Sequence, residues 1–175
     1  LLVDVYNRAK KLHLEVTLPR VVYIVETQSG KDSTAAELLK GMFSAQSGDF
    51  VTAVDESRVI LIKALERGDG EEQIEQTAQT IVDMMSTEAM LNVRVAYGSA
   101  VQELKDVSKS YKEATMALDV GKIFYVEKKV NSFGSLGIGR LIYQLPINLC
   151  RIFISEIFGE NDPGDFDEEI VSTVN

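Results

Sequence analysis

The chain has 175 residues, of which 45% are hydrophobic, and its 27 acidic and 18 basic side chains give a formal net charge of −9. This composition predicts one sizeable globular core, and the acidic balance disfavours direct contact with nucleic acid. No apolar run reaches the roughly 18 residues that a membrane span needs, and no signal segment is present, so we expect a cytoplasmic protein without a membrane partner.

The first part of the chain predicts a helix, a strand and a second helix. Residues 1–16 show helical spacing, and we expect a lead-in helix that arrives from an upstream domain. After Pro19, the unbroken apolar run of residues 20–26 is typical of a strand that is covered on both faces. Apolar residues from Ala35 to Phe43 then mark the buried stripe of a helix that we expect to end near Gly48.

Four further strands and two further helices are predicted along the middle of the chain. Two β-rich runs, at residues 50–54 and 58–63, flank a three-residue hairpin turn, and residues 74–89 have the spacing of an amphipathic helix. Strict alternation over residues 91–97 predicts a half-buried strand, which Gly98 closes. The next segment predicts a helix that begins at Leu104 and ends at Gly121, since glycine suits a helix end. Residues 129–133 predict a fifth short strand.

The order strand, helix, strand, strand, helix, strand predicts a ferredoxin-like α+β fold. Right-handed crossovers place the four strands in the order 4-1-3-2, with both helices on one face of the sheet. The two continuous apolar runs are then the central strands, and the alternating strand at residues 91–97 is an edge. Pattern and topology therefore agree, and extra C-terminal helices follow this core.

The most apolar segment of the chain begins after Pro146 and predicts a helix that needs cover on more than one side. That cover is either the sheet domain or also a second subunit, because a homodimer interface has the same composition. The candidate interface residues are Ile147, Cys150, Ile154, Ile157 and Phe158. We expect residues 165–175 to begin another helix, and we expect both ends of the chain to be cut from a longer protein.

The polar loop at residues 29–34, SGKDST, lies between a strand and a helix, where a phosphate loop would lie. A Walker A loop requires glycine where Val25 stands and serine or threonine where Asp32 stands. The loop of ATP pyrophosphatases has one glycine more than this loop. A polar turn with a helix cap explains every residue of the segment.

Several short motifs in the second half of the chain carry a resemblance to a known family. They are Tyr97-Gly98, Ser110-Tyr111 with Glu113-Ala114, Ala117-Leu118 with Gly121, and Leu136-Gly137 with Arg140-Leu141. The pattern resembles the degenerate GGDEF-like domain in the middle of bacterial transcription regulators of the carbohydrate-diacid (CdaR) and purine-catabolism (PucR) type. The resemblance implies a GGDEF-like domain at residues 17–144. It also implies that residues 145–175 lead to a C-terminal helix-turn-helix domain, which this chain does not include.

The resemblance also bears on catalysis. GGDEF cyclases carry two glycines and an acidic pair in the hairpin between strands 2 and 3, and a metal-binding aspartate at the end of strand 1. Here the hairpin Val54-Asp55-Glu56-Ser57-Arg58 has no glycine, and the first strand ends Val25-Glu26-Thr27. The chain is therefore expected not to be an enzyme, and no catalytic, metal or cofactor-binding residue is assigned.

The function that the resemblance implies is a signalling and dimerisation domain that couples an upstream effector-sensing domain to a DNA-binding domain. Two alternatives stay open. One is a small-molecule sensor in its own right, with a pocket between sheet and helices. The other is a nucleotide-handling enzyme, either diguanylate cyclase-like through the Asp55-Glu56 hairpin or ATP-pyrophosphatase-like through the loop at Ser29.

Overall fold

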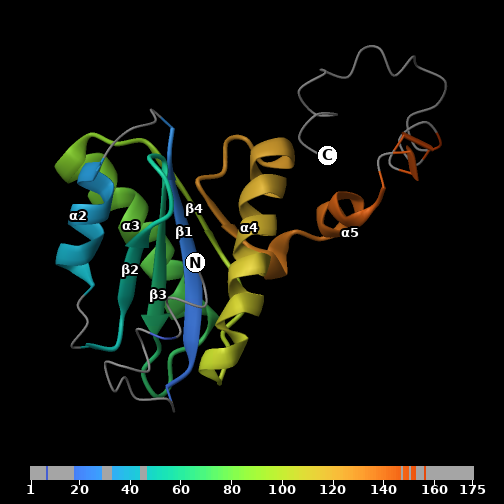
Figure 1. Cartoon of the computed structure of the whole chain (residues 1–175). Coiled ribbons are helices and arrows are strands. Elements are labelled where there is room, and N and C mark those ends of the chain that lie inside the picture. Colours follow the sequence, from blue (N-terminus) through green and yellow to red (C-terminus); the bar gives the residue numbers. More distant parts are fainter. Residues whose placement is uncertain are drawn as a thin grey trace.

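The computed structural model describes residues 18–28, 33–43 and 47–146, together with residues 7, 148, 149, 151, 152 and 156 (Figure 1). Three predictions fall largely or wholly outside these residues: the lead-in helix at residues 1–16, the loop at residues 29–32 and the helix that begins at residue 165. The candidate interface residues Ile147, Cys150, Ile154, Ile157 and Phe158 also lie outside the described residues.

Five strands form one sheet, in the order β2-β3-β1-β4-β5. Their bounds are Arg20–Thr27 for β1, Phe50–Ala53 for β2, Arg58–Ala64 for β3, Val93–Tyr97 for β4 and Val130–Ser132 for β5. The first four strands pair antiparallel with their neighbours, and β5 pairs parallel with β4. The predicted strand order and α+β class are confirmed, and β5 extends the sheet beyond β4.

The helices cover both faces of this sheet (Figure 1). Their bounds are Ser33–Met42 for α2, Glu71–Ala89 for α3, Val107–Phe124 for α4 and Ile138–Gln144 for α5, with short 3-10 helices η2 at Leu104–Asp106 and η3 at Phe133–Ser135. Helices α2 and α3 share one face, as predicted, and α4 covers the other. Helix α2 ends at Met42 and not near Gly48. No helix among the described residues is long and apolar enough to cross a membrane.

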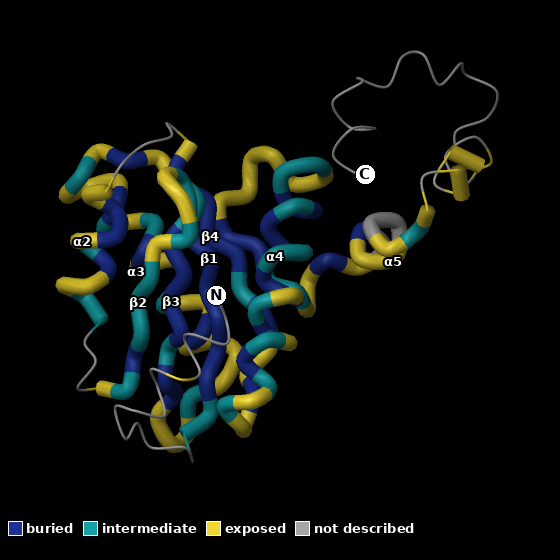
Figure 2. The backbone as a smooth tube through the Cα atoms, in the orientation of Figure 1, coloured by how far each residue is buried: buried dark blue, intermediate teal, exposed yellow. Residues whose placement is uncertain are grey.

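Two hydrophobic cores result, one on each face of the sheet. Along β1, Val21, Tyr23 and Val25 pack against α2 and α3. The alternate residues Val22 and Ile24 pack against α4. The central strands are buried along their length (Figure 2), because each of their two faces meets a helix. This confirms that the unbroken apolar run at residues 20–26 marks a strand covered on both sides.

The prediction that residues 91–97 form a half-buried edge strand is wrong. Strand β5 pairs with β4, so β4 is internal in the sheet. Its supposedly exposed face is also covered, because Arg94 is 6% exposed and Ala96 is fully buried. A buried arginine is compatible with this position only because backbone carbonyls of the chain after α4 accept its hydrogen bonds. The alternation of polar and apolar residues therefore did not report solvent exposure here.

The prediction that Gly121 ends its helix is also wrong, because α4 continues for three residues to Phe124. A Cβ atom at Gly121 would lie 2.5 Å from the Nδ2 atom of Asn131, a buried residue of β5. Glycine is therefore required by the close approach of α4 to β5 and not by a helix end.

Two helix-interior glycines should respond in opposite ways to the same substitution. Gly121→Ala should lower the free energy of unfolding by about 1–3 kcal/mol, because the new methyl group overlaps the Asn131 side chain. Gly41→Ala in α2 should raise it by about 1 kcal/mol, since nothing lies within 4 Å of the new Cβ and alanine favours helix. Urea unfolding followed by circular dichroism measures both. Equal effects of the two substitutions would contradict the packing argument.

Candidate functional site

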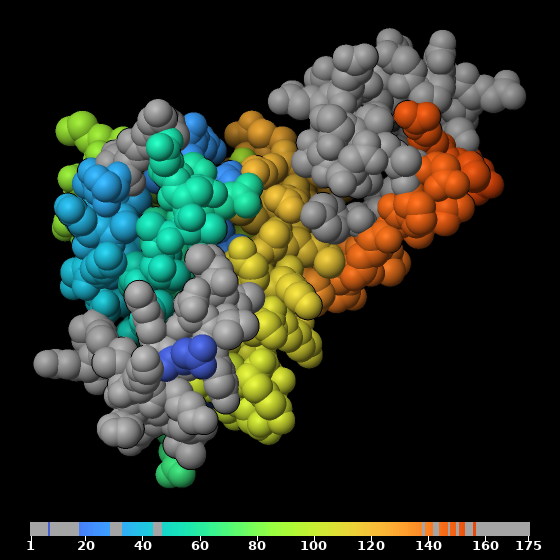
Figure 3. All heavy atoms as spheres, viewed as in Figure 1, coloured from blue at the N-terminus to red at the C-terminus, as the bar shows by residue number. Residues whose placement is uncertain are grey.

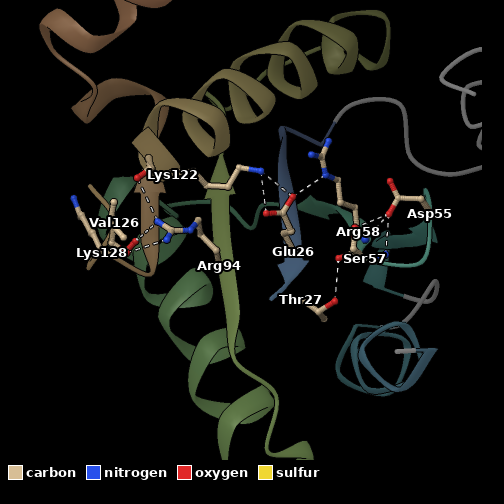
Figure 4. A network of polar contacts seen from close by, with 10 residues as sticks. Glu26, Thr27, Asp55, Ser57, Arg58, Arg94, Lys122, Val126 and Lys128 are labelled. Atoms are coloured by element: carbon tan, nitrogen blue, oxygen red, sulfur yellow. Dashed lines mark hydrogen bonds and ion pairs between the residues drawn. The ribbon is translucent and has the colours of Figure 1, made fainter. Parts of the chain in front are cut away.

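The residues that the cyclase pattern singles out lie at one end of the sheet. Here β1 ends, the β2–β3 hairpin turns, and the C-terminal part of α4 crosses the strands (Figure 4). Three charged residues form a row across the sheet at this end, because Glu26 is opposite Arg58 on one side and opposite Arg94 on the other. Their positions in the alternation place all three on the face that α4 covers.

The carboxylate of Glu26 is held by two cations from different elements. It accepts a hydrogen bond of 2.8 Å from the Nε atom of Arg58 on β3. It accepts a second, of 3.1 Å, from the Nζ atom of Lys122 on α4. The Glu26 side chain is 15% exposed, so these charge-assisted bonds form in a partly desolvated place. Glu26 therefore joins β1, β3 and α4, and its charge is compensated within the protein.

Asp55 is engaged by its own hairpin. Its Oδ1 atom accepts hydrogen bonds from the backbone N–H and the hydroxyl of Ser57, at 2.8 and 2.9 Å, and from the backbone N–H of Arg58 at 2.9 Å. The backbone bond from Ser57 is the main cause that lowers the pKa of Asp55. The backbone N–H of Thr27 donates to the carbonyl of Ser57, so the hairpin is tied to the end of β1. The predicted hairpin is confirmed, and Asp55 stabilises its turn.

Arg94 anchors the C-terminal end of α4 to the sheet. Its Nη1 atom donates to the carbonyls of Gly121, Tyr125 and Lys128 at 3.3, 3.3 and 3.0 Å, and its Nη2 atom donates to that of Val126 at 2.9 Å. The carbonyl of Gly121 also accepts a hydrogen bond from the backbone N–H of Tyr125, and that of Tyr125 accepts one from the backbone N–H of Lys128. The guanidinium therefore adds charge-assisted bonds to the negative end of the helix and to the segment after it, and these bonds supply its own partners.

A hollow of about 680 Å³ lies between α2 and the β2–β3 hairpin. The charged residues that line it are Glu37, Lys40, Asp55 and Glu56. Three carboxylates against one ammonium group disfavour a polyphosphate that has no accompanying cations. In the part of the chain that the structure describes, no group of three or more potential metal-ligating side chains comes together. As far as the described residues line it, the hollow has the size of a small-ligand site without the positive charge that a nucleotide site needs.

The short motifs behind the family resemblance are packing positions. A Cβ atom at Gly98 would lie 2.8 Å from the hydroxyl of Ser110 and still closer to its carbonyl oxygen. The Ser110 hydroxyl accepts a hydrogen bond of 3.0 Å from the backbone N–H of Val22, and Glu113 accepts one of 2.7 Å from the backbone N–H of Ser99. These contacts fasten α4 to β1 and to the end of β4.

The segment around residue 137 also serves packing. Leu136 is buried in the core beneath α4, and Gly137 has a φ angle of 54°. A Cβ atom at Gly139 would lie 2.8 Å from Val120, so α5 packs closely on α4. The predicted transition from loop to helix is confirmed.

Sequence reasoning missed Arg94 and Lys122 as members of this cluster. Arg94 in a strand and Lys122 in a helix occupy positions at which polar side chains ordinarily face solvent. Their partners lie 27 or more residues away along the chain. A basic residue inside a strand that ends against a helix C-terminus is the one signal that could have indicated Arg94.

Comparison with known proteins assigns the fold to a family. The family model described as "GGDEF-like domain" matches residues 2–120, which is more than half of the chain. The chain therefore belongs to the GGDEF-like domain family. Among solved structures, the GGDEF domain of DgcB from Caulobacter crescentus in complex with c-di-GMP matches with a TM-score of 0.49 and 11% identity. The match covers 75% of this chain and 85% of that chain. A comparison with curated proteins finds no match.

Replacing Arg94 should test its role as an anchor. Arg94→Met should lower the free energy of unfolding by about 2–4 kcal/mol, because one buried and three partly buried carbonyls lose a charged donor. Arg94→Lys should recover less than half of this loss, since a single ammonium group cannot reach all four carbonyls as the planar fork does. Urea unfolding measures both variants. If lysine restored full stability, positive charge alone and not the fork would hold α4.

Proposed function

We propose that this chain is a non-catalytic signalling and dimerisation domain of a bacterial transcription regulator of the CdaR or PucR type. In this role it couples an upstream effector-sensing domain to a C-terminal DNA-binding domain in the cytoplasm. The observation that supports the non-catalytic part of the proposal is that the Glu26 carboxylate is already paired within the protein. Glu26 stands at the end of β1 and is bound by Arg58 and Lys122.

Cyclase chemistry at this place would require oxygen ligands free to hold Mg²⁺. A divalent cation at the Glu26 carboxylate would have to displace two hydrogen-bonded cations or lie within a few ångströms of them. The Oδ1 atom of Asp55 likewise accepts hydrogen bonds from three donors within the hairpin turn. Both arrangements favour a structural use of the carboxylates.

A coupling role requires that elements at the edge of the domain move with its core. Arg94 pins the C-terminal end of α4 to the sheet, and Gly139 in α5 lies close to Val120 in α4. Figure 3 shows the orange segment that contains α5 against the yellow surface of α4. This supports a domain that passes the position of one neighbour to the next.

Dimerisation is supported by apolar side chains near the C-terminal end. Leu141 in α5 is 59% exposed, and the helical residues Leu149 and Ile152 are 45% and 52% exposed. They flank or lie within the predicted interface segment at residues 147–158. Side chains of this kind gain free energy when a second subunit covers them.

The proposal that the domain is non-catalytic predicts an absence of turnover. The purified chain, incubated with GTP or ATP and Mg²⁺, should release neither cyclic dinucleotide nor pyrophosphate, because Glu26 and Asp55 are engaged within the protein. Chromatography of the products measures this, with an active diguanylate cyclase assayed in parallel. Turnover that disappears in the Asp55→Ala, Glu56→Ala double variant would replace the proposal by the cyclase alternative.

The dimerisation proposal predicts a concentration-dependent dimer in sedimentation experiments. Ile152→Glu should convert it to a folded monomer, because the new carboxylate would be buried at the interface. Arg151→Glu changes an exposed neighbour on the same helical segment and should leave more of the dimer intact. A wild-type chain that stays monomeric at high concentration would refute the proposal. An Ile152→Glu variant that unfolds would favour burial within one subunit.

A further inference from the structure

A second cavity lies at the other end of the sheet from Glu26, on the face that α3 covers. Its volume is about 580 Å³, within the range of small-molecule sites. It is enclosed by the first turns of α3, the end of β4 and the segment after β5. The side chains that matter for its chemistry are Glu71, Glu75, Tyr97, Ser99, Ser132 and Ser135.

The topology of the sheet explains why a cavity forms here. Strands β4 and β5 are parallel and end side by side at Tyr97 and Ser132. After β4 the chain passes to α4 on the opposite face, while after β5 it turns into η3. Where neighbouring parallel strands send their connections in different directions, a crevice opens at their carboxyl ends. The first turn of α3 forms its remaining wall.

The cavity carries negative charge that the described residues do not compensate. Glu71 and Glu75 lie one turn apart on α3, and both line the cavity. Within the described part of the chain, neither forms an ion pair, and no basic residue is among the lining side chains. Like charges at this spacing repel each other. The pKa of Tyr97 is raised first by burial and then by the charge of Glu75, which shows the sign of the local field.

The opposite wall supplies an aromatic ring and hydroxyl groups in fixed positions. The centroid of the Tyr97 ring lies 5.5 Å from that of the Tyr23 ring. The Ser132 hydroxyl accepts from the backbone N–H of Ser135, and the Ser135 hydroxyl donates to the carbonyl of Ser132. An ordered ring, hydroxyl oxygens and two carboxylates are the groups that recognise an ammonium ion.

We propose that this cavity binds a small organic cation with a primary ammonium group, of the class of short diamines and amino alcohols. The ammonium group donates hydrogen bonds to the carboxylates of Glu71 and Glu75, and the carbon chain lies against Tyr97 and the serine hydroxyls. The same charges repel nucleotides and dicarboxylates. The proposal does not depend on the signalling role or on catalytic silence, because it concerns the other end of the sheet.

Calorimetric titration of the full chain with putrescine tests the proposal. At about 0.01 M ionic strength, where screening is weak, we expect saturable heat for a single site. The uncharged diol of the same chain length and succinate should give none. The Glu71→Gln, Glu75→Gln double variant should weaken the affinity at least about tenfold, the scale of one lost charged contact. Glu72→Gln removes a charge from the same helical turn outside the cavity and should change the affinity less than about twofold.

A steric variant separates the cavity from a diffuse charge effect. Ala100→Leu places a large side chain in the lining without changing any charge, and it should also weaken putrescine binding at least about tenfold. It decides the question by itself if the double amide variant proves unfolded by circular dichroism. The proposal is overturned if putrescine gives no saturable heat or if the diol or succinate binds equally well. It is also overturned if Glu72→Gln weakens binding as much as the double variant does.

Discussion

The contact between Arg94 and the C-terminal end of α4 is the interaction on which the two-faced arrangement of this domain depends. A guanidinium group that is 6% exposed needs acceptors, and four carbonyls at and after the end of α4 supply them. These bonds hold the end of α4 over the sheet, where α4 removes the apolar face of Val22 and Ile24 from water. Gly121 allows the same end of α4 to approach Asn131 closely.

The acidic residues that suggest catalysis are employed by the fold at this same end of the sheet. Glu26 joins three elements through Arg58 and Lys122, and Asp55 closes the turn that brings Arg58 into position. The two uses are linked, because the backbone N–H of Arg58 donates to Asp55 while its side chain donates to Glu26. A carboxylate at a signature position therefore has a structural reason to be present without any nucleotide.

The sequence was sufficient for the order of the first four strands and for the side on which α2 and α3 lie, because the order of the elements and right-handed crossovers determine both. It was insufficient for β4. Arg94 is polar and buried, and only its distant carbonyl partners at residues 121–128 make that possible. Gly121 was likewise interpreted locally, although its constraint comes from Asn131 on another element. The hairpin at Asp55 falls on described residues and is confirmed as a structural element. The interface residues from Ile147 to Phe158 stay a prediction.

The two ends of the sheet differ in how their charges are compensated. At the end of β1, each acidic group of the cluster is paired with cations or backbone donors, so a ligand would first have to break existing bonds. At the ends of β4 and β5, Glu71 and Glu75 face a cavity whose described lining residues include no cation. A charged ligand gains more free energy where the protein has not already compensated the charge, because no internal partner must be displaced. Within the described residues, the carboxylates of Glu26 and Asp55 are therefore engaged by the protein, whereas those of Glu71 and Glu75 are available to a cation.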